Sequence, residues 1–167
     1  MAKKEELNII EYYSLTRILK EHADYNVIYG ERSNGKSFSV EELGIDNYID
    51  KHEQMAIIRR EDVDIEMRNA STTFAHFVNN AKRGNIIEQK TKGKWNDITF
   101  FRGAWYLSKI DEQDRRIKDM NPFCYAFSLT AQEHYKSTSY SGITTILFDE
   151  FMTRRAYLPD EFILFQN

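Results

Sequence analysis

The sequence predicts an α/β protein in which helices flank a mainly parallel central sheet with an inserted antiparallel β segment. Short apolar runs rich in β-branched and aromatic residues alternate with segments of helical periodicity, as in parallel strands joined by crossover helices. Two of these runs end in polar groups typical of a ligand site. Residues 25–29 lead into a glycine-containing loop, and residues 143–148 lead into two carboxylates.

Length and composition indicate one domain over residues 1–167. The 167 residues are 41% hydrophobic and include two prolines and seven glycines, so a sizeable core is expected and linkers are not. No run approaches the roughly 20 apolar residues that a membrane span needs, and no secretory signal follows the charged N-terminus. The single cysteine, Cys124, cannot form an intrachain disulfide. We therefore expect a reducing, cytosolic setting and no membrane contact.

The remaining elements follow from periodicity and turn residues. Helical spacing predicts a short helix within residues 7–22, a helix from residue 36 to about 50, and a broken helix over residues 64–83. Gly44 lowers the helix propensity of the second of these. Strands are expected at residues 25–29, 54–60, 98–101, 104–107, 123–129 and 143–148. The charged residues 111–120 are expected to form a surface helix or loop.

The loop over residues 30–37 fits the pattern G-x-x-x-x-G-K-S/T through Gly30, Gly35, Lys36 and Ser37. In such loops the backbone N–H groups converge on phosphate oxygens at a helix N-terminus. The pattern predicts a nucleoside triphosphate site, and a glycine-rich turn with a surface lysine is the alternative. The residues expected to contact the nucleotide are Gly30, Glu31, Arg32, Ser33, Asn34, Gly35, Lys36, Ser37 and Phe38.

Asp149 and Glu150 directly follow a buried-type strand. Neighbouring carboxylates there repel each other and lose solvation unless a cation or water lies nearby, so they predict a metal site. With the loop, the expected roles are Lys36 on the β- and γ-phosphates, and Ser37 and Asp149 on Mg²⁺. Glu150 would orient the attacking water, which favours hydrolysis over transfer. A surface carboxylate is the alternative for Glu150.

Three arginines suggest that hydrolysis is gated. Arg32, inside the loop, would stabilise charge on the γ-phosphate, reach a neighbouring subunit, or lie in solvent. Arg59 and Arg60 end the strand at residues 54–60, and the carboxyl ends of strands in open α/β sheets face the ligand crevice. One of these two is expected to hold Glu150 away from water until another event releases it.

The charge is uneven along the chain. Residues 81–118 carry ten Lys/Arg and five Asp/Glu, a net charge of +5, although the whole chain has −3. This segment is therefore the candidate for a surface that faces a polyanion. A solvated surface of mixed charge is the alternative.

Residues 30–37, 57–60 and 144–151 together resemble the DNA-packaging (encapsidation) ATPases of small tailed bacteriophages. The resemblance runs in motif order from about residue 12 to the end. It implies a P-loop NTPase of the ASCE type that binds ATP and Mg²⁺. It also implies a homo-oligomeric ring on a viral portal, which threads double-stranded DNA into a prohead in the host cytoplasm.

The resemblance also implies individual roles. Lys36 and Ser37 match the Walker A pair, Asp149 and Glu150 match the Walker B aspartate and catalytic glutamate, and Arg59 matches an arginine that restrains that glutamate. Lys136, Arg154 and Arg155 fall where the family contacts a neighbouring subunit or DNA. The family continues past the equivalent of residues 158–161 into further core strands, a trans-acting arginine and a nuclease-like domain. The chain is thus expected to be an N-terminal ATPase domain or part of it, with impaired assembly and hydrolysis and no nuclease activity.

Two other functions fit the same loop. A P-loop kinase or nucleotide switch is disfavoured by Glu150 and by the lack of an Asn/Thr-Lys-x-Asp motif for reading guanine. A nucleotide-dependent assembly module without significant turnover is the second. Any DNA contact is expected to involve the phosphate backbone, because no zinc or helix-turn-helix motif is visible.

Overall fold

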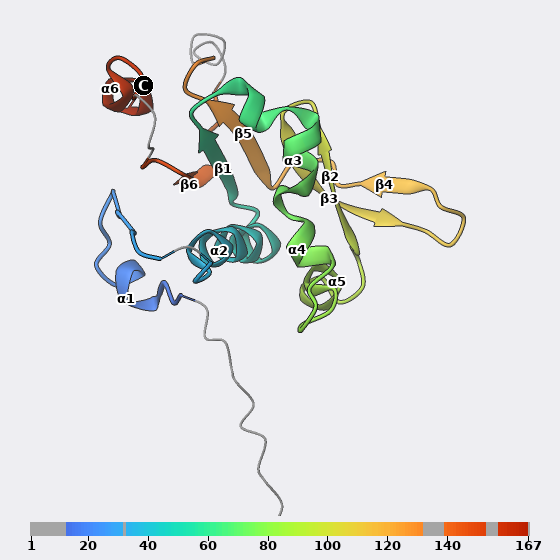
Figure 1. Ribbon diagram of the computed structural model, residues 1–167. Helices are drawn as coiled ribbons and strands as arrows, with labels where there is room; N and C mark the ends of the chain where they lie inside the picture. Colours follow the sequence, from blue (N-terminus) through green and yellow to red (C-terminus); the bar gives the residue numbers. More distant parts are fainter. Residues whose placement is uncertain (1–12, 32, 132–138, 153–156, 167) are drawn as a thin grey trace, which may run out of the picture. The chain divides into compact units, whose positions relative to one another are not determined.

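The computed structural model describes residues 13–31, 33–131, 139–152 and 157–166 (Figure 1). The chain forms two compact units, residues 1–43 and residues 44–167. No described helix is both long enough and apolar enough to cross a membrane.

The first unit contains the short helix α1 (Thr16–Leu19) and the start of helix α2 (Lys36–Lys51). The strand predicted at residues 25–29 is wrong, because this segment has no regular structure. Its large side chains are exposed: Tyr25 by 62%, Val27 by 70% and Tyr29 by 81%. A strand is stable only where a neighbouring strand satisfies its backbone groups, and no strand pairing includes this segment. The helix predicted within residues 7–22 is present at α1, and residues 7–12 lie outside the described residues.

Helix α2 runs through Gly44 into the second unit, where its side chains Ile45 and Tyr48 are buried. Strand β1 (Gln54–Arg59) follows the helix, and a Cβ atom built on Gly44 would overlap the side chain of Met55. The glycine therefore lowers helix propensity but permits close approach of the helix backbone to the strand. The helix predicted from residue 36 to about 50 is confirmed.

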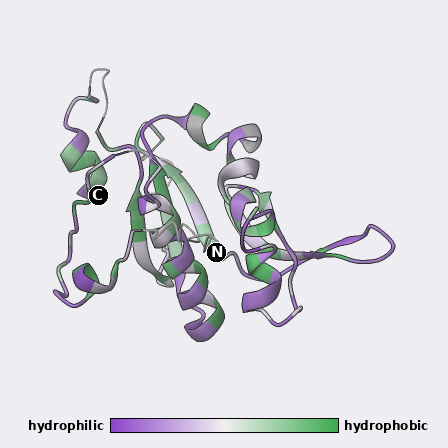
Figure 2. Cartoon of the chain, turned by 60° about the horizontal axis from the view of Figure 1, so that its bottom comes forward, coloured by the Kyte–Doolittle hydropathy of each residue, from purple (hydrophilic) through white to green (hydrophobic). Residues whose placement is uncertain are grey.

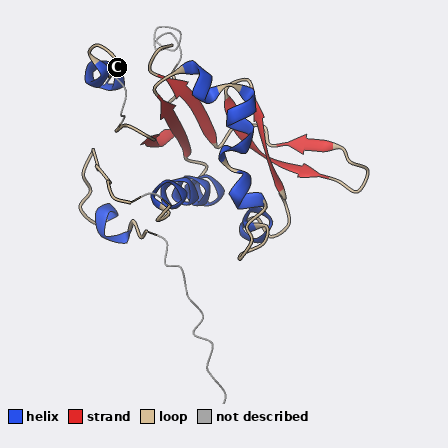
Figure 3. Ribbon diagram, in the orientation of Figure 1, coloured by secondary structure: helices blue, strands red, loops and turns tan. Residues whose placement is uncertain are grey.

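One six-stranded sheet organises the second unit (Figure 3). Strand β1 is parallel to its two neighbours, β5 (Cys124–Ser128) and β6 (Ile143–Phe148). The order is β2-β3-β5-β1-β6. Strands β2 (Asp97–Phe101) and β3 (Ala104–Ile110) form an antiparallel pair, and β3 is also antiparallel to β5. The predicted parallel core with an inserted antiparallel segment is thus present, although antiparallel pairing makes up more of the sheet than expected.

A further strand, β4 (Arg116–Lys118), pairs with β3. The surface helix or loop predicted for residues 111–120 is therefore wrong at these three residues. All three side chains are exposed, Ile117 by 56%, and a three-residue edge strand that buries no face is too short to give a period-2 pattern. Figure 1 shows β3 and β4 extending away from the rest of the sheet as a hairpin.

Short helices cover one face of the antiparallel half. In place of the broken helix predicted over residues 64–83, the chain forms three short helices, η1 (Asp62–Ile65), α3 (Met67–Thr73) and α4 (Ala75–Val78). Between α3 and α4, the Phe74 ring lies 5.2 Å from Trp105 and 5.0 Å from Phe123, and Trp105 Nε1 donates a hydrogen bond to Ala70 O at 2.8 Å. Helices α5 (Ile86–Lys90) and α6 (Glu161–Gln166) complete the described elements. Figure 2 shows the apolar residues gathered on the central strands and the hairpin loop as hydrophilic.

Candidate functional site

Residues 30–37, for which the sequence predicts phosphate binding and which we call the phosphate loop, lie in the first unit and end in the first turn of α2. Its backbone is curled: Ser33 and Gly35 have φ values of 63° and 84°, in the left-handed region that few non-glycine residues adopt. Successive turns of this kind point backbone N–H groups toward a common anion site. Ser37 and Phe38, in the first turn of α2, are half-buried. The Ser37 hydroxyl thus belongs to the first turn of the helix that follows the loop.

Lys36 folds back over this loop. Its Nζ donates hydrogen bonds to Glu31 O at 2.5 Å, to Asn34 Oδ1 at 2.9 Å and to Gly30 O at 3.3 Å. Three neutral acceptors of the loop therefore hold the ammonium group. Phosphate oxygens are charged acceptors and form stronger hydrogen bonds with an ammonium group, so they can replace these three.

Tyr13 and Ser39 also hold the loop, and sequence reasoning did not select either residue. Tyr13 N donates to Asn34 O at 3.0 Å, and Ser39 Oγ donates to Gly35 O at 2.9 Å and to Tyr13 O. These bonds join the segment before α1 to the loop. The motif has no position for either residue, so pattern matching could not have found them.

The two carboxylates follow β6 in the second unit. Asp149 N donates to Ile58 O at 3.3 Å, which extends the pairing of β6 with β1 by one residue. Asp149 Oδ2 lies 2.9 Å from Arg59 Nη2, and its Oδ1 accepts a hydrogen bond from Glu150 N at 3.1 Å. Both carboxylate oxygens of Asp149 are thus engaged.

Glu150 is held more loosely than Asp149. Its Oε2 lies 3.8 Å from Arg59 Nη1, and its side chain is 74% exposed, compared with 20% for Asp149. Its φ of 56° lies in the left-handed region, which costs a non-glycine residue about 1 kcal/mol or more and is frequent at functional sites. The structure therefore brings Arg59 to both carboxylates, and the nearer of the two is Asp149.

Arg60 donates a hydrogen bond from Nη1 to the backbone oxygen of Glu150 at 3.4 Å, but its ion pair is with another carboxylate. Its Nε lies 2.7 Å from Glu161 Oε2, its Nη2 lies 2.7 Å from Glu161 Oε1, and the two side chains are only 12% and 11% exposed. Nη2 also donates to Phe151 O at 2.8 Å, and the guanidinium lies over the Phe148 and Tyr157 rings at 5.8 and 5.5 Å. Hydrogen bonds from Arg60 are the largest cause that keeps the pKa of Glu161 below its usual value. Arg60 thus ties α6 to the end of β1.

Sequence reasoning missed the Arg60–Glu161 pair, since no spacing rule links residues so distant along the chain. Four other residues with expected roles lie outside the described residues: Arg32, Lys136, Arg154 and Arg155. Among the described residues, no group of three or more His, Cys, Asp or Glu side chains is arranged to hold a metal. The metal prediction therefore depends on Ser37 and Asp149, whose oxygen atoms are of the type that Mg²⁺ prefers.

No protein-family model and no curated protein matches this chain. Among solved structures, the N-terminal domain of the DNA packaging ATPase from bacteriophage phi29 aligns with a TM-score of 0.69 at 22% identity, over 93% of this chain and 69% of that chain. The bacteriophage Phi-29 viral genome packaging motor assembly aligns with a TM-score of 0.58 at 22% identity, over 93% of this chain and 41% of that chain.

The Phi-28 gp11 DNA packaging motor aligns with a TM-score of 0.60 at 20% identity, over 93% of this chain and 44% of that chain. The chain thus spans less than half the length of the two motor chains. At these identities the alignments establish the fold. The chain therefore has the fold of the N-terminal domain of a phage DNA packaging ATPase.

Proposed function

We propose that this chain is the ATP-hydrolysing part of a motor that moves double-stranded DNA into a viral prohead. The fold carries the proposal, because it is that of a packaging ATPase domain. The chain also has its own phosphate-loop motif and its own Asp-Glu pair after a parallel strand. The motor would be a homo-oligomeric ring on the viral portal, acting in the host cytoplasm during virion assembly.

ATP would bind through the curled loop. The backbone N–H groups of residues 30–37 would surround the phosphates, and Lys36 would exchange its three loop acceptors for β- and γ-phosphate oxygens. Arg32 would add a positive charge beside the γ-phosphate.

The residues present fit Mg²⁺, because Ser37 supplies a hydroxyl at the last position of the motif and Asp149 supplies a carboxylate directly after β6. Ser37 and Asp149 would hold the ion, which supplies compensation for the negative charge on the phosphate oxygens. In this structure Arg59 already places a cation on Asp149. Mg²⁺ would therefore have to compete with Arg59 for this carboxylate.

Glu150 would accept a proton from, or orient, the attacking water. Its exposed side chain is accessible to water, and its only described ion pair is the 3.8 Å contact with Arg59. Arg59 would thus restrain both carboxylates, and its withdrawal would release them together. Contacts with a neighbouring subunit or DNA would involve Lys136, Arg154 and Arg155.

Steady-state ATP hydrolysis, measured with and without duplex DNA, tests the proposal. We expect Mg²⁺-dependent hydrolysis that DNA stimulates and that falls by about a hundredfold or more in Glu150→Ala. Glu112→Ala is a matched control, because it makes the same substitution at an exposed glutamate of the β3–β4 turn. Nucleotide-dependent association with no turnover in the presence of DNA would contradict the proposal and support an assembly module.

A further inference from the structure

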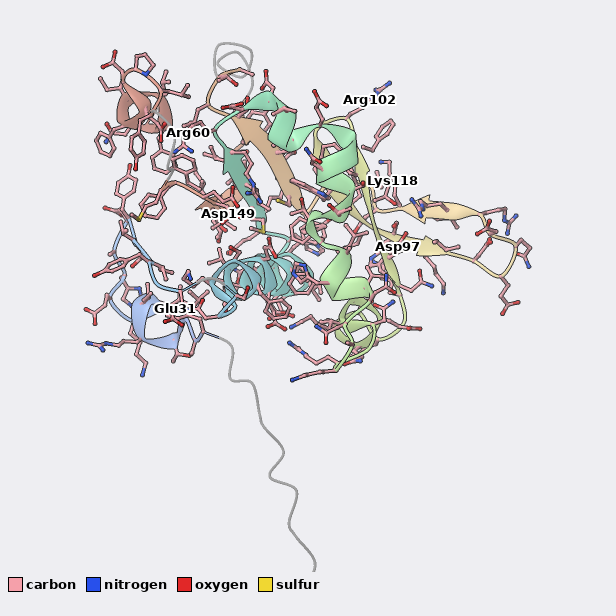
Figure 4. The ribbon with its side chains drawn as sticks, viewed as in Figure 1. Glu31, Arg60, Asp97, Arg102, Lys118 and Asp149 are labelled. Carbon is pink, nitrogen blue, oxygen red and sulfur yellow. The ribbon has the colours of Figure 1, made fainter. Side chains whose placement is uncertain are left out.

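The turn and strands at the antiparallel end of the sheet carry a surface of two cations on two aromatic rings. The β2–β3 register pairs Phe101 with Ala104 and Thr99 with Tyr106, and the β3–β4 register pairs Ser108 with Lys118. Because side chains alternate along a strand, Phe101, Tyr106 and Lys118 share one face of the sheet. Arg102 lies in the β2–β3 turn beside Phe101 (Figure 4). We call these four residues the basic-aromatic surface.

The rings hold the cations in place. Lys118 Nζ lies 3.8 Å from the Tyr106 ring centroid and 5.5 Å from that of Phe101, and the Arg102 guanidinium lies 5.1 Å from the Phe101 centroid. Phe101 is 41% exposed, and both cations are exposed. Cation–π contacts of this kind restrict the side chains without neutralising their charge. The N–H donors that do not face a ring are therefore available to an anion.

No described carboxylate forms an ion pair with Arg102 or Lys118. Arg116 shares the face with Lys118 and pairs with Asp97 at 3.0 Å, and Arg115 in the hairpin pairs with Asp111 at 2.8 Å. The nearby carboxylates Asp97 and Asp111 thus form their described ion pairs with these two arginines. The two cations on the rings account for part of the +5 net charge of residues 81–118.

We propose that the basic-aromatic surface binds the phosphate backbone of double-stranded DNA. Unneutralised Lys and Arg side chains are the groups that contact phosphates, and such contacts need no particular sequence. Proteins that bind single-stranded nucleic acid stack bases on exposed aromatic rings. Here Lys118 lies over the ring of Tyr106 and Arg102 lies over the ring of Phe101. The choice of DNA rests on the proposed function. The site itself is new, because it lies outside the phosphate loop and the Asp149–Glu150 pair.

Binding of a fluorescent duplex to the whole chain, followed by anisotropy without nucleotide, tests this surface. Between about 50 and 200 mM salt, the affinity should fall steeply. The slope of log affinity against log salt is negative, and each lost phosphate contact reduces its magnitude by about 0.9. We expect Lys118→Gln and Arg102→Gln each to weaken binding about three- to tenfold with this change in slope. Lys118→Arg should stay within about twofold of the unaltered chain, because it keeps the charge on the Tyr106 ring.

Arg115→Gln is the matched control, since it removes the same charge from a residue already paired with Asp111. Circular dichroism and the unfolding midpoint establish that each variant folds. Equal loss of affinity in Arg115→Gln and Lys118→Gln would overturn the proposal. A variant that carries both Arg102→Gln and Lys118→Gln and keeps the affinity and the salt dependence of the unaltered chain would also overturn it. Tighter binding of an RNA duplex at the same salt would overturn the assignment to DNA. A chain that binds DNA as described but hydrolyses no ATP would retain this inference and contradict the proposed function.

Discussion

The guanidinium of Arg59 lies 2.9 Å from the carboxylate of Asp149, the residue that sequence reasoning assigned to a metal ion. Strand β6 lies at the edge of the described sheet and is not the buried strand that the sequence predicts, but the Asp149 side chain is only 20% exposed, and an arginine at the end of the neighbouring strand provides its compensating cation. Any divalent ion must therefore compete with Arg59 for Asp149. Arg59 thus bears on metal binding as well as on the restraint of Glu150.

Arg59→Ala should lower the Mg²⁺ concentration needed for half-maximal ATP hydrolysis by about fivefold. The reason is that a partly buried ion pair of this kind contributes about 1 kcal/mol, which Mg²⁺ no longer has to replace. Hydrolysis without DNA should also rise, and stimulation by DNA should shrink, because Glu150 loses its restraint. A Mg²⁺ titration of hydrolysis measures all three effects. If the variant matched the unaltered chain in all of them, Arg59 would have no gating role.

Arg60→Ala should destabilise the fold by about 1 to 3 kcal/mol, because it leaves Glu161 nearly buried without its bidentate partner. Urea unfolding at neutral pH measures this difference. Arg115→Gln, at the exposed pair with Asp111, should change stability by less than about 0.5 kcal/mol. Equal effects in the two variants would show that α6 does not depend on Arg60.

The same pair makes stability depend on pH. The pKa of Glu161 is lower in the folded chain, chiefly through hydrogen bonds from Arg60. Its stabilising contribution is therefore complete above the unfolded-state pKa of about 4.3 and is lost as pH falls through the folded-state value. The stability difference between the unaltered chain and Glu161→Gln should shrink below about pH 4. A difference that stayed constant from pH 7 to pH 3 would contradict this assignment.

Gly44→Ala should destabilise the chain by about 1 to 3 kcal/mol, although alanine normally favours a helix over glycine by about 1 kcal/mol. The cause is overlap of the new methyl group with Met55, which is fully buried. Adding Met55→Ala should make the Gly44→Ala change less costly than it is alone. Urea unfolding of the four chains of this double-mutant cycle gives the coupling, and a stabilising Gly44→Ala would contradict the packing described here.

Much of the second unit was predictable, because its parallel strands are continuous apolar runs, although only β1 and β5 are buried and Ile146 of β6 is 56% exposed. The strand predicted at residues 143–148 is β6 with the same bounds, and those predicted at residues 54–60 and 123–129 are β1 and β5 with small differences at the ends. Residues 25–29 show the limit of this reasoning. An apolar run indicates that a segment can be buried in a sheet, but hydrogen-bonded neighbours decide whether it becomes a strand.

Local patterns in the sequence select candidate site residues, but they do not reveal contacts between residues that are distant along the chain. Residues 30–37 and the Asp149–Glu150 pair were identified from local patterns, and the placement of Arg59 beside the carboxylates follows from its position at the end of β1. The Arg60–Glu161 pair, the bonds from Tyr13 to the loop and the cations over Tyr106 and Phe101 depend on register and folding. No local sequence pattern predicts any of these contacts.

If the loop at residues 30–37 and Asp149 act on one Mg²⁺-bound ATP, adding Mg²⁺ should increase the affinity for ATP through both. Calorimetric titration of ATP, with Mg²⁺ and with a chelator, measures this gain. We predict that Mg²⁺ tightens binding to the unaltered chain by about tenfold or more, and that Ser37→Ala and Asp149→Asn each lose most of this gain but keep the metal-free affinity. A full Mg²⁺ gain in Asp149→Asn would contradict the claim.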